Sequence, residues 1–497
     1  MRNLYQFAGL IFCMAITVPA ARSQQQPDQA QQPQQPQQPE QPQQPQGQEQ
    51  PIPAYKSPLA SQADNDAAGN GSSQLAPDNR PLTGIQDFSL GVPLDRHSYW
   101  QPHAEIDFTG DSEPPDGGGA GWTAWTSIVG GVDVLRYAGN TELSFDYLGG
   151  GVFSNNGSVS NGVIQDVNLA AQFNFRRWTL TLIDELRYTP EIAFGNAGFG
   201  GLSGTVGISG GLGGVLGTDD TILNAFGQRL INSSAAQVNV LLSPRSSLTF
   251  SGGYSELYFV DQDLLNSTEI RAQAGYNYQL TKKDTVGVAY LFDGFRYSNF
   301  PQSIDTHSAL LSYGRRITGR LAFQASAGPE YAIFQNGLAS GTPGGTTSPS
   351  SSSQLYWSLY TALRYQLQRT GLYASYSHGV TGGSGVLAGA IGDTVQGSVS
   401  RQISRTLNGD INLGYARNKG LPVPFPGFTT VNGTYDYWSA GGHLTHPWGR
   451  TLQLFVGYQF QYQNSNAPFC SGTGCGGSYT RNLITVGLGW RAQPKVF

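Results

Sequence analysis

Ten charged residues occupy polar positions in segments where polar and apolar residues alternate. They are Asp133, Asp146, Asp166, Glu185, Arg187, Arg271, Asp293, Glu330, Arg364 and Asp410. Successive side chains of a β-strand point to opposite faces, so these charges would share one face of a sheet. Carboxylates and guanidinium groups facing one another across water create a field that orients small polar solutes. The same groups could instead pair with one another and with glutamines to fill a closed interior.

Residues that could support catalysis are few and scattered. The glycine-rich stretch 207–211 matches G-x-S-x-G around Ser209, but that pattern requires a strand before it and a helix after it. The six histidines are His97, His103, His307, His378, His443 and His446. They form no acid–base or metal-ligand constellation. We therefore predict that the protein is not an enzyme and has no catalytic residue, metal site or cofactor.

The N-terminus is typical of an exported protein. Residues 1–23 combine Arg2, an apolar stretch from about residue 8 to 20, and small residues before Gln24, which predicts a signal peptide cleaved there. Two cysteines remain after cleavage, Cys470 and Cys475, in the sequence CSGTGC. Their closeness in an exported chain favours a disulfide within one loop over free thiols.

Residues 24–96 form a segment of different composition. Glutamine and proline dominate as far as about residue 47, and polar residues continue to about residue 79. Such a sequence buries too little apolar surface to offset its ordering entropy, so we expect a disordered periplasmic linker and lead-in. The linker could act as a spacer, or it could bind the cell wall or a periplasmic partner.

The clearest alternation lies in 450–463. Its apolar side chains include Leu454, Val456 and Tyr458, and its polar ones include Gln453 and Gln461. One face would meet an apolar medium and the other would meet water, as in a membrane-crossing β-strand of a barrel. A soluble β-sandwich also alternates, but its connections need not follow the rhythm described next.

The whole region 97–497 can be divided into about eighteen such strands, with sixteen possible. We place them at 97–108, 126–138, 141–150, 162–175, 177–189, 232–242, 247–259, 268–281, 284–297, 304–316, 319–334, 353–367, 371–380, 391–403, 406–417, 433–445, 450–463 and 479–491. Tight polar turns follow the even strands, and longer connections follow most odd ones. Bacterial barrels have short periplasmic turns and long extracellular loops, so both termini are expected in the periplasm.

Composition agrees with this fold class, an all-β transmembrane antiparallel barrel. Only 12% of residues are charged, and the one long apolar run lies in the predicted signal peptide, so we expect no transmembrane helix after cleavage. The net charge of −5 is small for 497 residues and argues against a nucleic-acid partner.

The longest predicted connection, residues 189–231, is a candidate constriction loop. It contains a glycine-rich stretch and then TDDTILNAFGQRL, which could form a short helix. If this loop folds into the barrel, Asp219, Asp220 and Arg229 would line the narrowest point. A plain extracellular loop is the other reading.

At the level of pattern, residues 97–497 resemble the outer-membrane β-barrel proteins of Gram-negative bacteria, and porin-like channels of sixteen or eighteen strands are the most similar. Phe497 is similar to the C-terminal aromatic residue of that family, although Pro494 and Lys495 interrupt the alternation before it. The resemblance implies an outer-membrane location, contact with outer-membrane lipid and a possible homotrimer.

These observations predict a porin-like channel for passive diffusion of small hydrophilic solutes. A structural or export-associated barrel with an occluded lumen is the second hypothesis. An outer-membrane esterase that uses Ser209 is the third.

Overall fold

A computed structural model describes residues 98–112, 122–154, 161–189, 228–260, 265–298, 302–336, 350–367, 369–383, 387–421, 433–465 and 478–497. The predicted signal peptide, the linker 24–96, Ser209, Asp219, Asp220, Cys470 and Cys475 lie outside these residues.

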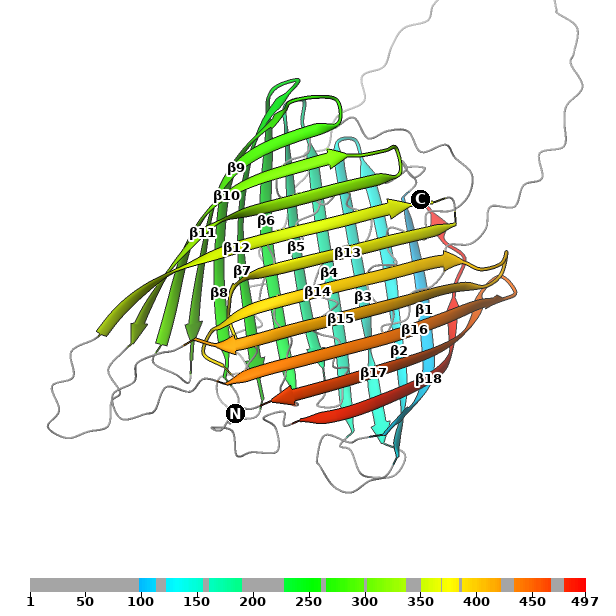
Figure 1. Ribbon diagram of the computed structural model, residues 1–497. Coiled ribbons are helices and arrows are strands. Elements are labelled where there is room, and N and C mark those ends of the chain that lie inside the picture. Colours follow the sequence, from blue (N-terminus) through cyan, green and yellow to red (C-terminus); the bar gives the residue numbers. More distant parts are fainter. Residues whose placement is uncertain are drawn as a thin grey trace, which may run out of the picture. The chain divides into compact units, whose positions relative to one another are not determined.

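Nineteen β-strands make up the described chain (Figure 1). They are β1 (Tyr99–Asp111), β2 (Thr123–Ala138), β3 (Thr141–Ser154), β4 (Gly162–Asn174), β5 (Trp178–Thr189), β6 (Arg229–Ser243), β7 (Ser246–Phe259), β8 (Ser267–Gln279), β9 (Asp284–Tyr297), β10 (Gln302–Arg316), β11 (Leu321–Asn336), β12 (Ser350–Gln366), β13 (Thr370–Thr381), β14 (Ala390–Gln402), β15 (Asn408–Gly420), β16 (Thr434–Trp448), β17 (Leu452–Ser465), β18 (Tyr479–Arg491) and β19 (Lys495–Val496). Within the described ranges, no helix is long and apolar enough to cross a membrane.

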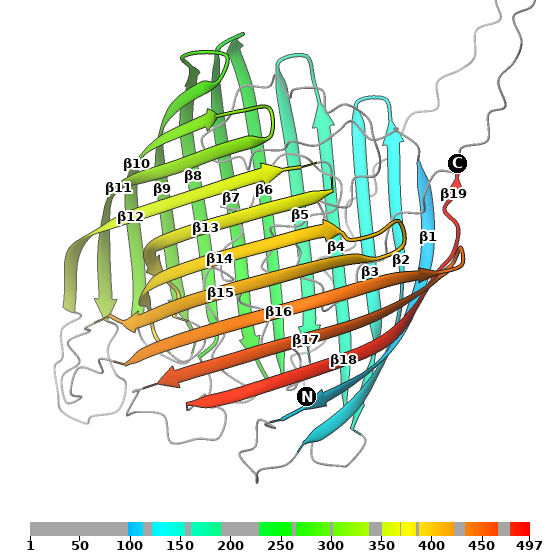
Figure 2. The ribbon, with the colours of Figure 1, turned by 45° about the vertical axis from the view of Figure 1, so that its right-hand side comes forward.

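Strands β1 to β18 form one antiparallel barrel in which each strand pairs with its neighbours in the sequence (Figures 1 and 2). The sheet closes where β1 pairs with β18, from His103 opposite Arg491 to Asp111 opposite Leu483. Closure removes the exposed sheet edges that an open β-sheet would present. The predicted fold class and the predicted number of eighteen membrane-length strands are therefore confirmed.

The C-terminus returns to the barrel after the interruption at Pro494. The two-residue strand β19 pairs with Tyr99 and Trp100 of β1, and the backbone N–H of Phe497 donates to the carbonyl oxygen of Ser98 at 3.1 Å. This extra pairing holds both ends of the barrel sequence together at the end where the short turns lie.

The two faces of the barrel wall differ as the alternation predicts. In β1, Ile106 and Phe108 are 47% and 51% exposed, whereas Glu105 and Asp107 between and beside them are 3% and 5% exposed. Large exposed apolar side chains continue around the outer face of the other strands. An apolar outer belt around a closed sheet is the surface that a lipid bilayer solvates.

Candidate functional site in the barrel lumen

Strand register places charged side chains on the inner face of the wall. All ten residues singled out by the alternation lie there, because each is paired in register with inward residues of its neighbouring strands. Their part in lining a solute path stays a prediction. Eight further inner-face charges were not singled out: Glu105, Asp107, Asp111, Glu142, Glu269, Arg316, Arg481 and Arg491. Arg229, which was expected in the constriction loop, begins β6 and also faces inward.

Two inner-face arginines are each held between two carboxylates. Arg271 lies 2.5 Å from Asp293 on β9, measured from Nε to Oδ1, and 3.0 Å from Glu269 on its own strand. Arg187 contacts Asp166 and Glu185 in the same way, at 3.2 and 2.7 Å. These guanidinium groups are thus neutralised by the wall itself.

A third arginine ties the last long strand to the first. Arg481 of β18 donates from Nε and Nη2 to one oxygen of Asp111 on β1, at 2.9 and 2.7 Å, and both side chains are almost fully buried. Close by, the hydroxyl groups of Thr109 and Thr485 lie 2.9 Å apart. The barrel seam is therefore closed by side chains as well as by backbone pairing.

The sheet pairing is incomplete between β12 and β13. These strands pair only from Leu359 opposite His378 to Gln366 opposite Gly371, so the first half of β12 has no β13 partner. Beyond His378, the backbone N–H of Val380 donates instead to Oε2 of Glu330 on β11, at 3.1 Å. Glu330 belongs to the inner face, so this end of β13 leaves the wall and crosses into the lumen.

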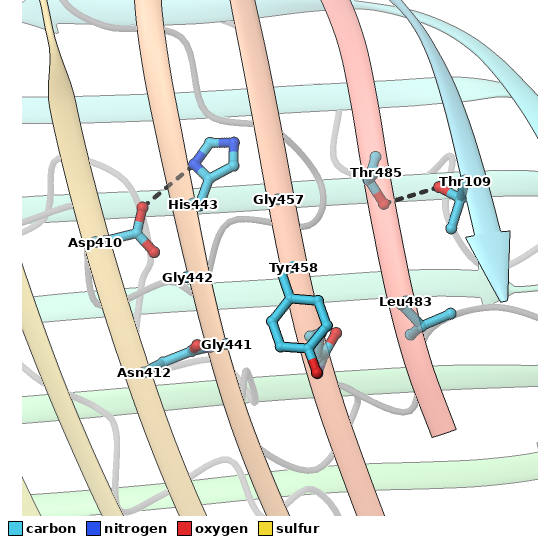
Figure 3. Close-up of a pocket in the computed structure, with 11 residues that line it drawn as sticks. Thr109, Asp410, Asn412, Gly441, Gly442, His443, Gly457, Tyr458, Leu483 and Thr485 are labelled. Carbon is cyan, nitrogen blue, oxygen red and sulfur yellow. Dashed lines mark hydrogen bonds and ion pairs between the residues drawn. The ribbon is translucent and has the colours of Figure 1, made fainter. Parts of the chain in front are cut away.

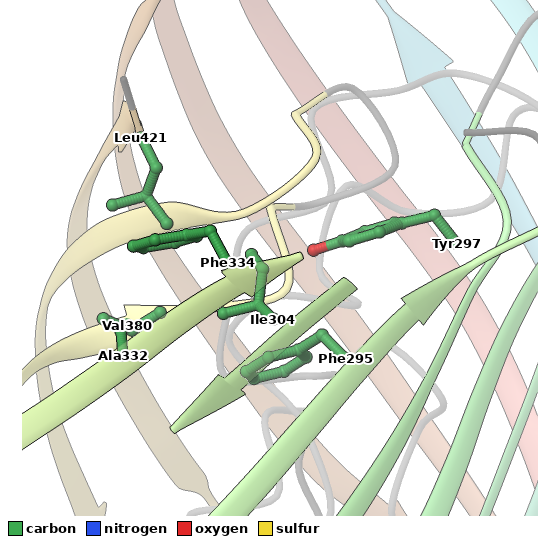
Figure 4. Close-up of a cluster of buried hydrophobic side chains, with 7 residues drawn as sticks. All are labelled: Phe295, Tyr297, Ile304, Ala332, Phe334, Val380 and Leu421. Carbon is green, nitrogen blue, oxygen red and sulfur yellow. The ribbon is translucent and has the colours of Figure 1, made fainter. Parts of the chain in front are cut away.

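An apolar cluster holds this inturned end against the inner faces of the nearby strands β9, β10 and β11. Phe295 and Ile304, from the inner faces of β9 and β10, pack with Val380 and Leu421 (Figure 4). The hydroxyl group of Tyr297 donates to the carbonyl oxygen of Gly382 at 2.8 Å. The inturned segment consists of residues 379–383, at and after the end of β13, and residues 387–390, which lead into β14. It narrows the lumen at the end that carries the long connections.

Two glycines give the inturned segment its sharp path. Gly383 and Gly389 have φ of 86° and 89°, a conformation that costs a residue with a Cβ considerable strain. A Cβ on Gly389 would also collide with the side chain of Ile304.

We predicted a constriction in residues 189–231. Those residues are described only at their two ends, next to and within β5 and β6. The narrowing that the structure describes comes from β13 and β14.

A recess opens in the inner wall between β15, β16, β17 and β18, with Thr109 of β1 at its border (Figure 3). The inward positions 441 and 457 are glycines and leave the space, while Asp410, Asn412 and Gln459 border it. His443 also lines the recess, with Nδ1 3.2 Å from Oδ1 of Asp410. A carboxylate, two amides and an imidazole therefore converge on one hollow.

Another predicted candidate, Arg364, lies above the ring of Tyr373, 5.9 Å from its centroid. Tyr360 is nearby, with its hydroxyl 3.5 Å from that of Tyr373. This polar aromatic patch lies near the short-turn end of β12 and β13. Across the described ranges, no group of three His, Cys, Asp or Glu side chains could hold a metal ion.

No protein-family model matches the chain, and no curated protein matches its sequence. Distant similarity to solved structures includes Acinetobacter baumannii OccAB3 (TM-score 0.40, 11% identity, 80% of this chain and 99% of that chain). It also includes two Pseudomonas aeruginosa proteins, OccK2 (OpdF) in complex with glucuronate (0.39, 10%, 80% and 98%) and the outer membrane protein OpdK (0.37, 11%, 79% and 99%).

Proposed function

We propose that this protein is a porin-like channel of the bacterial outer membrane that lets small hydrophilic solutes diffuse through its lumen. The observation that carries the proposal is the polar inner face of a closed eighteen-strand barrel whose outer face is apolar. Barrels of sixteen to eighteen strands enclose an aqueous channel. Polar groups on the inner face interact with water and solutes. Because most charges lie on that face, few charged side chains are exposed to lipid.

The inturned segment supplies the selective element of the proposed channel. It places Val380, together with Leu421 at the end of β15, against the inner faces of β9 to β11. A constriction that is apolar on one side limits solute size and leaves the charged wall on the other side to orient polar solutes. We infer that the short turns and both termini lie in the periplasm, and that residues 24–96 form a linker on that side.

Liposome swelling with uncharged sugars of increasing size tests the proposed function. Vesicles containing the folded protein should swell in monosaccharides and swell more slowly as the sugar grows, because the constriction limits entry. Folding is checked by heat-modifiable migration on a gel. Vesicles that contain folded protein and fail to swell in any sugar would contradict the proposal.

One observation favours a second function, a structural barrel with an occluded lumen. Many inner-face side chains are buried, among them Gln461, Gln463 and Arg481, which are at most 1% exposed. In that case the vesicles would swell in no sugar and would pass no ions. A homotrimer and a cell-wall partner for the linker are further proposals; crosslinking in native membranes tests the first, and co-sedimentation with peptidoglycan tests the second.

A further inference from the structure

The inner face carries more negative than positive charge. Among the described strand residues, twelve carboxylates and seven arginines face inward, and no lysine does. The excess is concentrated on the wall of β1 to β3, where Glu105, Asp107, Asp133 and Asp146 all face inward. Rings and walls of carboxylates favour cations in a pore. Buried charges are also screened less by salt than exposed ones.

The arginines on this face are largely engaged by carboxylates of the wall. Arg187, Arg271, Arg481 and Arg491 each contact at least one acidic side chain. A guanidinium already bonded to carboxylates attracts an anionic solute weakly, because its charge is compensated. The acidic surplus therefore determines the sign of the field that a solute meets.

Asp410 pairs with a histidine and not with an arginine. Asp133 also contacts a histidine, but it is bonded to Arg491 as well. Within the described part of the chain, the carboxylate of Asp410 contacts His443 and no arginine or lysine. The register places it opposite Ser400 on one side and His443 on the other. Its negative charge is thus left without a permanent positive partner.

His443 adds a second acceptor to the same recess. Its Nδ1 lies beside a carboxylate, which fixes the proton of a neutral imidazole on that nitrogen and leaves a lone pair on Nε2. Nε2 has no hydrogen-bond partner in the described structure, although the side chain is only 8% exposed. A buried polar atom without a partner is costly, so a hydrogen-bond donor bound in the recess would be stabilised there.

Glycine keeps the recess open. A Cβ at position 441 would collide with Oδ1 of Asn412, so only glycine lets this amide lie where it does. At position 457 a Cβ would lie 3.7 Å from Cδ2 of His443, an ordinary contact that fills space without displacing anything. The two positions therefore offer one disruptive and one conservative way to reduce the recess.

We propose that the lumen selects cations and that the recess at Asp410 and His443 is a subsite for the ammonium group of a small hydrophilic solute. This inference rests on the proposed channel function. The carboxylate of Asp410 would bind the ammonium, and Nε2 of His443 with the amide oxygens of Asn412 and Gln459 would accept hydrogen bonds from its N–H and neighbouring hydroxyl groups.

Planar-bilayer recording of the full-length protein tests this proposal. In a potassium chloride gradient the reversal potential should show preference for potassium over chloride. Glucosamine, which carries an ammonium group, should interrupt the current at lower concentration than N-acetylglucosamine, which has the same ring without the charge. Asp410→Asn should raise the glucosamine concentration needed by about tenfold, as expected for the loss of one charge-assisted hydrogen bond.

Asp436→Asn is the matched control, since it removes the same charge from the outer face of β16, where Asp436 accepts from Tyr415. It should leave both the reversal potential and the glucosamine effect unchanged. If Asp410→Asn fails to fold, Gly457→Ala serves in its place, and it should weaken the glucosamine effect while keeping potassium preference.

Channels that prefer chloride, or an Asp410→Asn variant that responds to glucosamine like the wild type, would overturn the subsite while leaving the channel function intact. If folded protein gave no stepwise current, both the proposed subsite and the proposed channel function would be contradicted.

Discussion

Two inner-face carboxylates, Asp111 and Asp410, differ in what holds them. Asp111 receives two hydrogen bonds from Arg481 and is fully buried, so its charge is compensated at the barrel seam. Among the described residues, Asp410 contacts the imidazole of His443 at the edge of a recess, and Nε2 of that imidazole has no hydrogen-bond partner there. Arginine supplies five N–H donors in a fixed fork, whereas a neutral histidine supplies one. The first pair therefore serves stability, and the second remains able to bind a solute.

Removal of the arginine should produce the largest effect. Arg481→Ala leaves the carboxylate of Asp111 buried without its cation, which we expect to lower the free energy of unfolding by about 3–5 kcal/mol. Urea unfolding in phospholipid vesicles measures this change. The double variant Arg481→Met with Asp111→Leu removes both charges and should recover most of the loss. An Arg481→Ala barrel as stable as the wild type would show that the seam pair is not structural.

A third inner-face carboxylate, Glu330, is held by a backbone amide and not by a side chain, so its removal extends the comparison. Glu330→Ala leaves the N–H of Val380 without its acceptor, which should cost about 1–3 kcal/mol of stability. Because that hydrogen bond holds the inturned segment, single-channel conductance should also rise. Glu330→Gln keeps an amide oxygen in place and should stay close to the wild type. Equal conductance in the alanine variant and the wild type would mean that this segment does not limit flow.

The outer face carries a carboxylate–histidine pair that matches the recess in chemistry. Asp393 lies 2.7 Å from Nδ1 of His378 and also accepts from the hydroxyl of Tyr376, while His378 stacks on Trp357. Because these partners lie on the lipid-facing side, Asp393→Ala should lower stability by about 1 kcal/mol and leave ion preference unchanged. Thermal unfolding and reversal potentials measure the two properties. A shift in reversal potential would contradict the assignment of this pair to the outer face.

The barrel could be predicted from the sequence because lipid and water act on alternate residues. Each strand had to place its Leu, Val and aromatic side chains outward and its polar ones inward, and this local rule gave the number of strands and the faces of the charges. Glu105 and Asp107 followed the same rule beside Ile106 and Phe108 and could have been identified.

Features that depend on distant register could not be predicted in this way. Arg481 and Asp111 are 370 residues apart, and their contact exists only because the barrel closes. The inturned segment depends on where pairing between β12 and β13 stops, and no residue in either strand indicates that position. The glycines at 383 and 389 are the one local signal, and similar glycine-rich stretches elsewhere in the chain made it ambiguous.

Single-channel recording of the wild-type protein in planar bilayers is the most direct test of the proposed channel. Folded protein should give discrete current steps of uniform size, because each barrel provides one polar path past the inturned segment. Membranes that remain electrically silent after verified insertion of folded barrels would contradict the channel function and favour the occluded structural barrel.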